Sequence, residues 1–416
     1  MSEQRGRMAR AAESGRSTAA GFTTDGIKRL EEVVGGHVDR GSVVGASWLV
    51  ARGGEFHHGV AGTLEDSGGP PVGEDTIFRI SSMTKPVTAI AALILVDECT
   101  LRLDEPVDRW LPELADRQVL ARPGGPLEET VPAHRPVTLR DLLTFRLGWG
   151  MDFSFSTPQP VLEAMAELGL GVGPPRPAGP PEPDEWMRLV SPLPLEYQPG
   201  TKWLYHTSAD VLGVLVARAA GRPFGTVLRE RIFEPLGMRD TAFVVPAEDL
   251  TRFGPCYWND PASGGRVVFD PADGEWSRPP AFPSGGAGLV STLADYQAFA
   301  ELLMGRGSYR GQRLVSRVAV ETMTTNQLTD AQREASVVDL QGGVGWGFGV
   351  GVHVRRTQPT ASVGTYGWDG GLGTSWHNDP TEDLTGIILT NQAWSSPAPP
   401  PVCQDFWTAT YAAFAD

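Results

Sequence analysis

Several patterns that mark common enzyme classes are missing from the sequence. The three cysteines are far apart, and none of the seven histidines belongs to a His-Glu-x-x-His motif or another metal-binding pair. We therefore expect free thiols, no metal and no cofactor. The Gly-x-Ser-x-Gly turn of α/β-hydrolases is also absent, because its nearest match, residues 373–377, lacks the second glycine. This absence disfavours an α/β-hydrolase.

Positive charge and long apolar runs are also scarce. The formal net charge of −15 disfavours nucleic acids and anionic membranes as partners and favours a neutral or cationic small molecule. No segment approaches the roughly 18 apolar residues of a membrane span, and the N-terminus lacks the apolar core of a secretory signal. We expect a soluble, cytoplasmic protein with a disordered tail over residues 1–20. The oligomeric state stays open.

The rest of the composition predicts a folded enzyme-sized chain. With 416 residues, 41% of them hydrophobic and 20% charged, the chain can bury a large core in one large domain or two closely packed ones. The 50 glycines and 35 prolines predict long loops between the elements.

Strand patterns stand at the two ends of the chain and helical patterns in the middle. We expect strands over residues 43–51, 56–61, 347–354, 374–378 and 384–390. We expect helices over residues 24–38, 82–98, 139–145, 209–220, 224–233 and 403–414, with one more helix capped by Ser291 and Thr292. The helix from residue 82 is apolar almost all round, so it should be central.

This order predicts an α+β fold with one antiparallel sheet of about five strands, flanked by helices. The sheet domain would comprise residues 21–98 and 285–416. A mostly helical insertion would fill residues 99–284. Its Pro-rich loop, residues 171–183, either lines a pocket as a lid or is simply solvated.

Ser82 and Lys85 at the start of the central helix form the strongest chemical signal. Their i, i+3 spacing places both side chains on one face, with the serine at the positive end of the helix. A serine needs an adjacent base to become a nucleophile, and a buried lysine has the lowered pKa of a base. The chain has only three lysines, so this one is notable. The alternative is an N-cap serine beside a lysine that reaches solvent.

Several segments together resemble the class C β-lactamase family and its relatives, the family VIII esterases, D-aminopeptidases and acyltransferases. The nucleophile motif is FRISSMTKP, and the segments TLRDLLT, PGTKWLYHTSADVLG, IFEPLGMRDTAF, GGAGLVST and YGWDGGLGTSW follow in the order of the family. The resemblance covers nearly the whole chain after the tail, and it implies a β-lactamase-like fold.

The resemblance also implies roles for Tyr205 and Thr207. Tyr205 stands at the position of the family tyrosine, which with Lys85 shuttles the proton of Ser82 in acylation and deacylation. Thr207 stands where relatives often carry Asn or Ser, so its hydrogen bond to a substrate amide is less assured. Without the motif, the favoured interpretation of Tyr205 is a core aromatic with a satisfied hydroxyl.

The third family motif departs from the β-lactamases. Where they carry Lys-Thr-Gly on the edge strand of the sheet, this chain has Trp368, Asp369 and Gly370. The missing cation puts β-lactam turnover in doubt and makes the chain most similar to the esterase branch. By resemblance, the amides of Ser82 and Gly371 form an oxyanion hole, and the two glycines leave room for substrate. The alternative is a pair of ordinary turn glycines.

The aromatic-rich stretch from residue 149 to 155, with Trp149 and Phe153, is a candidate acyl pocket, although core packing explains these rings equally well. We therefore predict a serine hydrolase that forms an acyl-enzyme at Ser82 on small carboxylic esters or amides. The alternatives are an acyltransferase with an alcohol or amine acceptor, a β-lactamase, and a non-catalytic binding or sensor protein.

Overall fold

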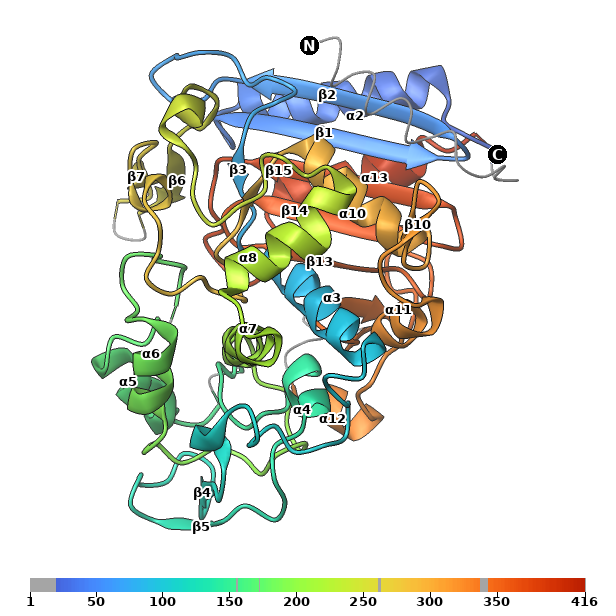
Figure 1. The fold of residues 1–416 in the computed structure, drawn as a ribbon. Coiled ribbons are helices and arrows are strands. Elements are labelled where there is room, and N and C mark those ends of the chain that lie inside the picture. The colour runs from blue at the N-terminus through green and yellow to red at the C-terminus, as the bar shows by residue number, and fades with distance from the viewer. Residues whose placement is uncertain (1–19, 155, 172, 261–262, 337–342, 416) are drawn as a thin grey trace.

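The computed structural model describes residues 20–154, 156–171, 173–260, 263–336 and 343–415. Residues 1–19 of the predicted tail therefore lie outside the described residues. The fold centres on an antiparallel sheet in the order β11-β12-β13-β14-β15-β1-β2 (Figure 1). Its strands are β1 Gly45–Arg52, β2 Glu55–Gly62, β11 Val344–Trp346, β12 Gly351–His353, β13 Tyr366–Gly370, β14 Thr374–Asp379 and β15 Leu384–Thr390.

The sheet joins the two ends of the chain. β1 pairs with β15 from Ala46↔Thr390 to Arg52↔Leu384, and it also forms a hairpin with β2. This pairing confirms the predicted α+β class and the antiparallel sheet. The sheet has seven strands rather than about five. β13 escaped prediction because its glycines, Gly367 and Gly370, have low strand propensity. β13 is also not the edge strand, since β12 and β11 lie beyond it.

Two terminal helices cover one face of the sheet. α2, Thr24–Asp39, and α13, Pro401–Ala412, pack against each other and against the sheet (Figure 1). Leu30 and Phe406 from these helices meet Trp48 and Ile388 from the strands in one buried cluster. Side chains along a strand alternate between the two faces of the sheet. Leu49, the neighbour of Trp48 in β1, therefore faces the opposite side and belongs to another buried cluster.

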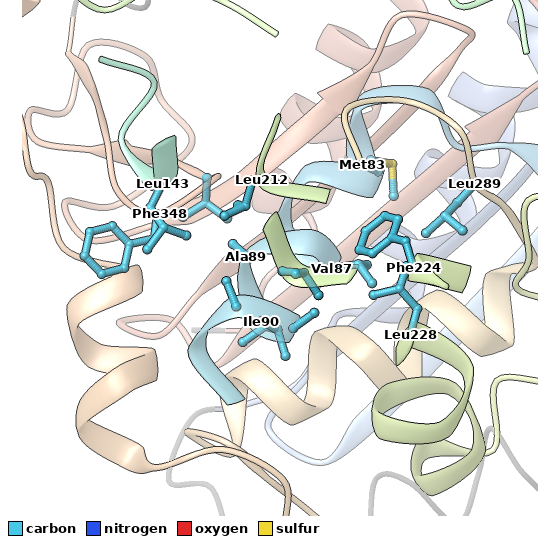
Figure 2. Close-up of a cluster of buried hydrophobic side chains, with 14 of the residues drawn as sticks. Met83, Val87, Ala89, Ile90, Leu143, Leu212, Phe224, Leu228, Leu289 and Phe348 are labelled. Carbon is cyan, nitrogen blue, oxygen red and sulfur yellow. The ribbon is translucent and has the colours of Figure 1, made fainter. Parts of the chain in front are cut away.

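The opposite face carries the central helix. α10, Leu293–Met304, packs on β14, β15 and β1, and the hydroxyl of Tyr296 donates to the carbonyl of Met83 over 2.9 Å. That carbonyl immediately precedes α3, Thr84–Asp97, whose residues 84–95 are all buried. Figure 2 shows Val87, Ala89 and Ile90 of this helix inside the main apolar cluster. The predicted central helix is confirmed.

One predicted helix cap differs. Thr292 caps α10, because its hydroxyl accepts from the amide of Asp295. Ser291 was also predicted as a cap, but it belongs to the short strand β8, Val290–Ser291, which pairs with β3, Phe78–Arg79.

The middle of the chain is mainly helical and lies beside α3 (Figure 1). Its helices are α4 Leu139–Leu143, α5 Pro160–Glu167, α6 Pro183–Val190, α7 Thr207–Ala220, α8 Phe224–Leu228 and α9 Glu234–Leu236, with a π-helical turn at Arg229–Phe233. The remaining elements are strand pairs and short helices: β4 Gln118–Leu120 with β5 Thr130–Pro132, β6 Cys256–Asn259 with β7 Arg266–Asp270, β9 Ser308–Tyr309 with β10 Gln312–Arg313, α11 Arg317–Met323 and α12 Asp330–Glu334.

Helix length bears on membrane insertion. In the described part of the chain, no single helix is long and apolar enough to cross a membrane, and one bent pair, α7 with residues 224–236, meets that test by length and composition.

Leu212 of α7 points toward α3 inside the main apolar cluster (Figure 2). Leu212→Ala leaves a cavity in this close-packed cluster, so we expect a loss of about 2–5 kcal/mol in the free energy of unfolding, measured as a lower urea midpoint. The control is Val318→Ala, whose side chain is 61% exposed and which should change stability by less than about 0.5 kcal/mol. Equal effects of the two substitutions would contradict this packing.

Candidate active site

Ser82 lies where the chain turns from a strand into the central helix. β3 is followed by the 3-10 turn η1, Ser81–Met83, and then directly by α3. Ser81 holds a φ of +45°, which is unusual for a residue other than glycine and marks a tight, strained turn. Ser82 is 7% exposed, and its hydroxyl lines the main cavity of the described chain.

Lys85 is buried directly behind Ser82. Its side chain is 1% exposed, and its amine contacts the Ser82 hydroxyl at 2.8 Å, the carbonyl of Gly286 at 2.7 Å and Nδ1 of His206 at 3.2 Å. Burial lowers the pKa of Lys85 to about 7, and the nearby charge of Asp210 opposes this shift. A lysine that reaches solvent, the alternative from the sequence, is thereby ruled out.

Tyr205 lies above the same pair. Its ring centroid is 4.4 Å from the Lys85 amine, and its hydroxyl accepts a hydrogen bond from the indole of Trp368 over 2.7 Å. Burial raises the pKa of Tyr205 to about 12, while hydrogen bonds with Ser82 and Trp368 lower it in part. Tyr205 is therefore a neutral phenol near pH 7, and Lys85 is the stronger candidate base.

The β13–β14 hairpin closes against the Ser82 turn. The hydroxyl of Thr374 donates to the carbonyl of Ile80 over 3.2 Å, and a Cβ at Gly370 would lie 2.3 Å from that same oxygen. Gly370 therefore allows two backbones to approach, and the prediction that it leaves room for substrate is wrong. Gly371 is different, because a Cβ there would meet nothing within 4 Å and the residue lines the cavity beside Ser82.

Asp369 and Trp368 lie next to each other on β13 but contact different surroundings. Trp368 contacts Tyr205, whereas the carboxylate of Asp369 accepts from the Ser375 hydroxyl at 2.5 Å and contacts His377 Nε2 at 3.2 Å. This divergence follows from the alternation of side chains along a strand. Both residues line the cavity, so the carboxylate is a feature of its wall.

The cavity beside Ser82 is large and is lined by residues from several elements. Its volume is about 790 Å³. Its apolar lining from α5, α6 and part of the Pro-rich loop comprises Leu162, Met165, Leu170, Pro174, Pro175 and Trp186. The lining also includes Asp369, His377, Trp394 and Trp407. Among the described residues that line the cavity, none is lysine or arginine.

The predicted pocket residues separate into two groups. Phe153 and Thr207 line the cavity, and the Phe153 ring lies 5.3 Å from that of Tyr205. Trp149, in contrast, is fully buried in the core, where its indole donates to the carbonyl of Pro194 over 2.7 Å. The prediction of Trp149 as a pocket residue is therefore wrong. Phe155, in the same stretch, lies outside the described residues.

Sequence reasoning missed a His–Asp pair behind Lys85. Nε2 of His206 lies 3.0 Å from a carboxylate oxygen of Asp210, and the other carboxylate oxygen accepts from the Ser284 hydroxyl at 2.6 Å and the Gly286 amide at 3.0 Å. Burial works to raise the pKa of Asp210, but His206, Ser284 and Gly286 together lower it. The i, i+4 spacing of the pair at a helix start was the available signal.

Among the described residues, no group of three His, Cys, Asp or Glu side chains is placed to hold a metal ion. The Ser82 hydroxyl contacts the buried amine of Lys85 and hydrogen-bonds with the neutral phenol of Tyr205, and the amine lies 4.4 Å from the centroid of the phenol ring. A nucleophile with an adjacent base and proton donor is the set required for nucleophilic acyl transfer.

Comparisons with known proteins agree with this geometry. A family model described as Beta-lactamase matches residues 30–400. Protein Rv1367c of Mycobacterium tuberculosis is 39% identical over 329 residues, covering 77% of this chain and 79% of that protein. Esterase EstB of Burkholderia gladioli is 32% identical over 398 residues, covering 89% and 92%. The solved structure of EstCE1, described as a hydrolase with promiscuous acyltransferase activity, matches with a TM-score of 0.74 and 25% identity, covering 93% and 98%.

The titration of Lys85 can be measured directly, because the chain has only three lysines. In protein labelled with ¹³C-lysine, we expect the ε-CH₂ resonance of Lys85 to titrate near pH 7, since burial disfavours the ammonium. Lys202, paired with Asp152, should titrate above its ordinary pKa. Lys85→Arg assigns the signal. A Lys85 resonance without a transition below about pH 9 would contradict the buried amine.

Proposed function

The chain belongs to the Beta-lactamase family of serine hydrolases, and on this premise we propose that it hydrolyses small carboxylic esters through an acyl-enzyme at Ser82. The observation that carries the proposal is the contact between Ser82 and a buried lysine amine, 2.8 Å away, with a pKa of about 7. A general base is most effective when its pKa lies near the working pH. Esterase EstB, similar over most of both chains, supports the choice of esters.

The proposed acylation step moves one proton and forms one bond. The neutral amine of Lys85 takes the hydroxyl proton of Ser82 while the serine oxygen attacks the ester carbonyl carbon. The amides of Ser82 and Gly371 stabilise the oxyanion that forms, as expected for fixed donors aimed at developing charge. The C–O bond to the alcohol then breaks, and Tyr205 protonates the departing alkoxide and is reprotonated by Lys85.

Deacylation follows the same path in reverse. A water molecule takes the place of the alcohol and attacks the acyl carbonyl carbon. Its proton passes to Tyr205, whose own proton passes to Lys85. The bond between acyl group and Ser82 breaks, the serine oxygen regains its proton, and the acid product leaves.

The cavity wall supports neutral esters over β-lactams as acyl donors. β-Lactam antibiotics carry a carboxylate, for which the Lys-Thr-Gly motif of lactamases supplies a cation. Here Trp368 and Asp369 stand in that motif, and no lysine or arginine is among the described lining residues. A substrate carboxylate would meet a like charge instead of a partner. The apolar lining of the cavity fits the acyl group.

Acyl transfer to an alcohol or amine is the second candidate function. The cavity of about 790 Å³ has room for a donor and an acceptor together, and the similar structure EstCE1 is described as a hydrolase with acyltransferase activity. Both reactions share the acyl-enzyme. Measuring the partition between acid and transfer product, with added alcohols and amines, separates them.

Ser82→Ala tests the nucleophile. With a short p-nitrophenyl ester, intact-mass spectrometry of the quenched wild type should show one added acyl group, and the variant should show none. We expect turnover to fall by about 10³-fold or more, because the acyl-enzyme cannot form. Ser263→Ala, at an exposed serine, is the matched control and should behave as wild type. Wild-type turnover by Ser82→Ala would contradict the proposal and would indicate another nucleophile.

Asp369→Asn tests the charge of the cavity wall. The substitution removes one negative charge but keeps an oxygen for Ser375, so the wall should stay in place. For paired esters that differ only by a carboxylate on the alcohol part, kcat/KM for the anionic ester should rise about tenfold relative to the neutral one, as expected when one like charge is removed from the cavity wall at an effective dielectric constant of ~20. An unchanged ratio would show that Asp369 does not select substrates.

A further inference from the structure

The amine of Lys85 has three polar neighbours, and their chemistry constrains its protons. A neutral amine has two N–H bonds and one lone pair. The carbonyl of Gly286, 2.7 Å away, accepts hydrogen bonds only, so one N–H must point to it. Whether the lone pair points at the Ser82 hydroxyl then depends on the third neighbour, Nδ1 of His206, 3.2 Å away.

Asp210 decides which nitrogen of His206 carries the proton. Its carboxylate accepts only and lies 3.0 Å from Nε2, so whenever the ring is neutral Nε2 carries the N–H and Nδ1 is an acceptor. The carboxylate is itself held by Ser284 and the amide of Gly286. Nδ1 therefore takes the second N–H of Lys85, and the lone pair of the amine remains for the proton of Ser82.

The backbone holds His206 in this place against its own preference. Its φ of +79° and ψ of −63° form a γ-turn, closed by the hydrogen bond from the amide of Thr207 to the carbonyl of Tyr205 at 3.2 Å. This conformation is strained for a residue other than glycine and persists only where the surroundings impose it. Gly286 leaves space for the ring, since a Cβ there would lie 2.8 Å from Cε1 of His206.

We propose that His206, oriented by Asp210, is a positioning residue that directs the lone pair of Lys85 toward the hydroxyl of Ser82. The inference rests on the proposed function, because it concerns the same acylation step. When the Ser82 proton arrives, the ammonium of Lys85 donates to the serine oxygen, to the Gly286 carbonyl and to Nδ1 of His206. The proton count is unchanged, and the charge of Asp210 stabilises the ammonium.

The experiment compares His206→Ala with His206→Asn in pre-steady-state acylation by a short p-nitrophenyl ester. The Ala variant loses the acceptor, and its acylation rate constant should fall about 10- to 100-fold, as for other residues that orient a reacting group. The carbonyl oxygen of Asn stands near the place of Nδ1, and Asn tolerates a positive φ, so His206→Asn should recover most of the rate. His134→Ala, at an exposed loop histidine, is the matched control and should acylate as wild type.

The pH profile separates positioning from a merely structural role. The titratable groups that face Lys85 are Tyr205, His206 and Asp210. The acylation rate rises with pH as Lys85 loses its proton, and the charge of Asp210 raises the pKa of that lysine. Asp210→Asn should therefore move the rise to lower pH. Its amide N–H also faces Nε2, which places the ring proton on Nδ1 against Lys85 and lowers the maximal rate.

The outcomes are distinct. A slow His206→Ala, a restored His206→Asn and a shifted profile for Asp210→Asn support the proposal, with circular dichroism melting used to confirm folded variants. Wild-type acylation by His206→Ala, or equal loss in the Ala and Asn variants with an unshifted profile for Asp210→Asn, overturns it. If the wild type itself forms no acyl adduct, the proposed function fails instead.

Discussion

The buried amine of Lys85 is the constraint on which the rest of this structure depends. Burial strongly disfavours the charged form of an amine. A buried amine also needs hydrogen-bond partners in the protein to replace the water molecules that it has lost. Those partners come from segments far apart in the chain. The β3–β8 pairing and the hydrogen bond from the amide of Ile80 to the carbonyl of Leu289 place the loop of Gly286 beside the Ser82 turn. Thr88 ties the same loop to α3 through the carbonyl of Gly285. The fold thus assembles the environment of one side chain.

The neutral indole of Trp368 affects which of Tyr205 and Lys85 is the better base. A cation at this position would stabilise the phenolate of Tyr205, because an opposite charge favours the ionised form. Trp368 offers a hydrogen bond without a charge, and the pKa of Tyr205 stays high, at about 12. Lys85 then has the lower pKa of the two groups, which suits it to be the base of the proposed mechanism and Tyr205 to be the proton donor. In the proposed mechanism, the residue at this one strand position therefore affects both the acyl donor that the cavity accepts and the order of the proton transfers.

The sequence predicted those features that repeat along a chain and missed those set by contact. The terminal strands alternate or run apolar and α3 is a nearly continuous apolar run, so pattern revealed them. The spacing of Ser82 and Lys85 needed only one helical turn. β13 was missed because close approaches require its glycines, that of Ile80 at Gly370 and that of Trp376 at Gly367, and no local pattern shows such contacts. Trp149 and Phe153 lie in one aromatic stretch, and only packing distinguishes a core ring from a pocket ring. His206 lies 121 positions from Lys85, and its tautomer depends on Asp210.

The choice between water and another acceptor does not need a further catalytic group. Once the alcohol leaves, Lys85 and Tyr205 return to their starting protonation, and any hydroxyl at the place of the alcohol meets the same base. Water is always present, so an acceptor competes only if the cavity holds it in a reactive position, where effective concentrations reach about 10⁵ M or more. The large cavity with aromatic walls provides the contact area for such binding. In the proposed mechanism, the fit of an acceptor against this wall, rather than the chemistry at Ser82, therefore decides between hydrolysis and transfer.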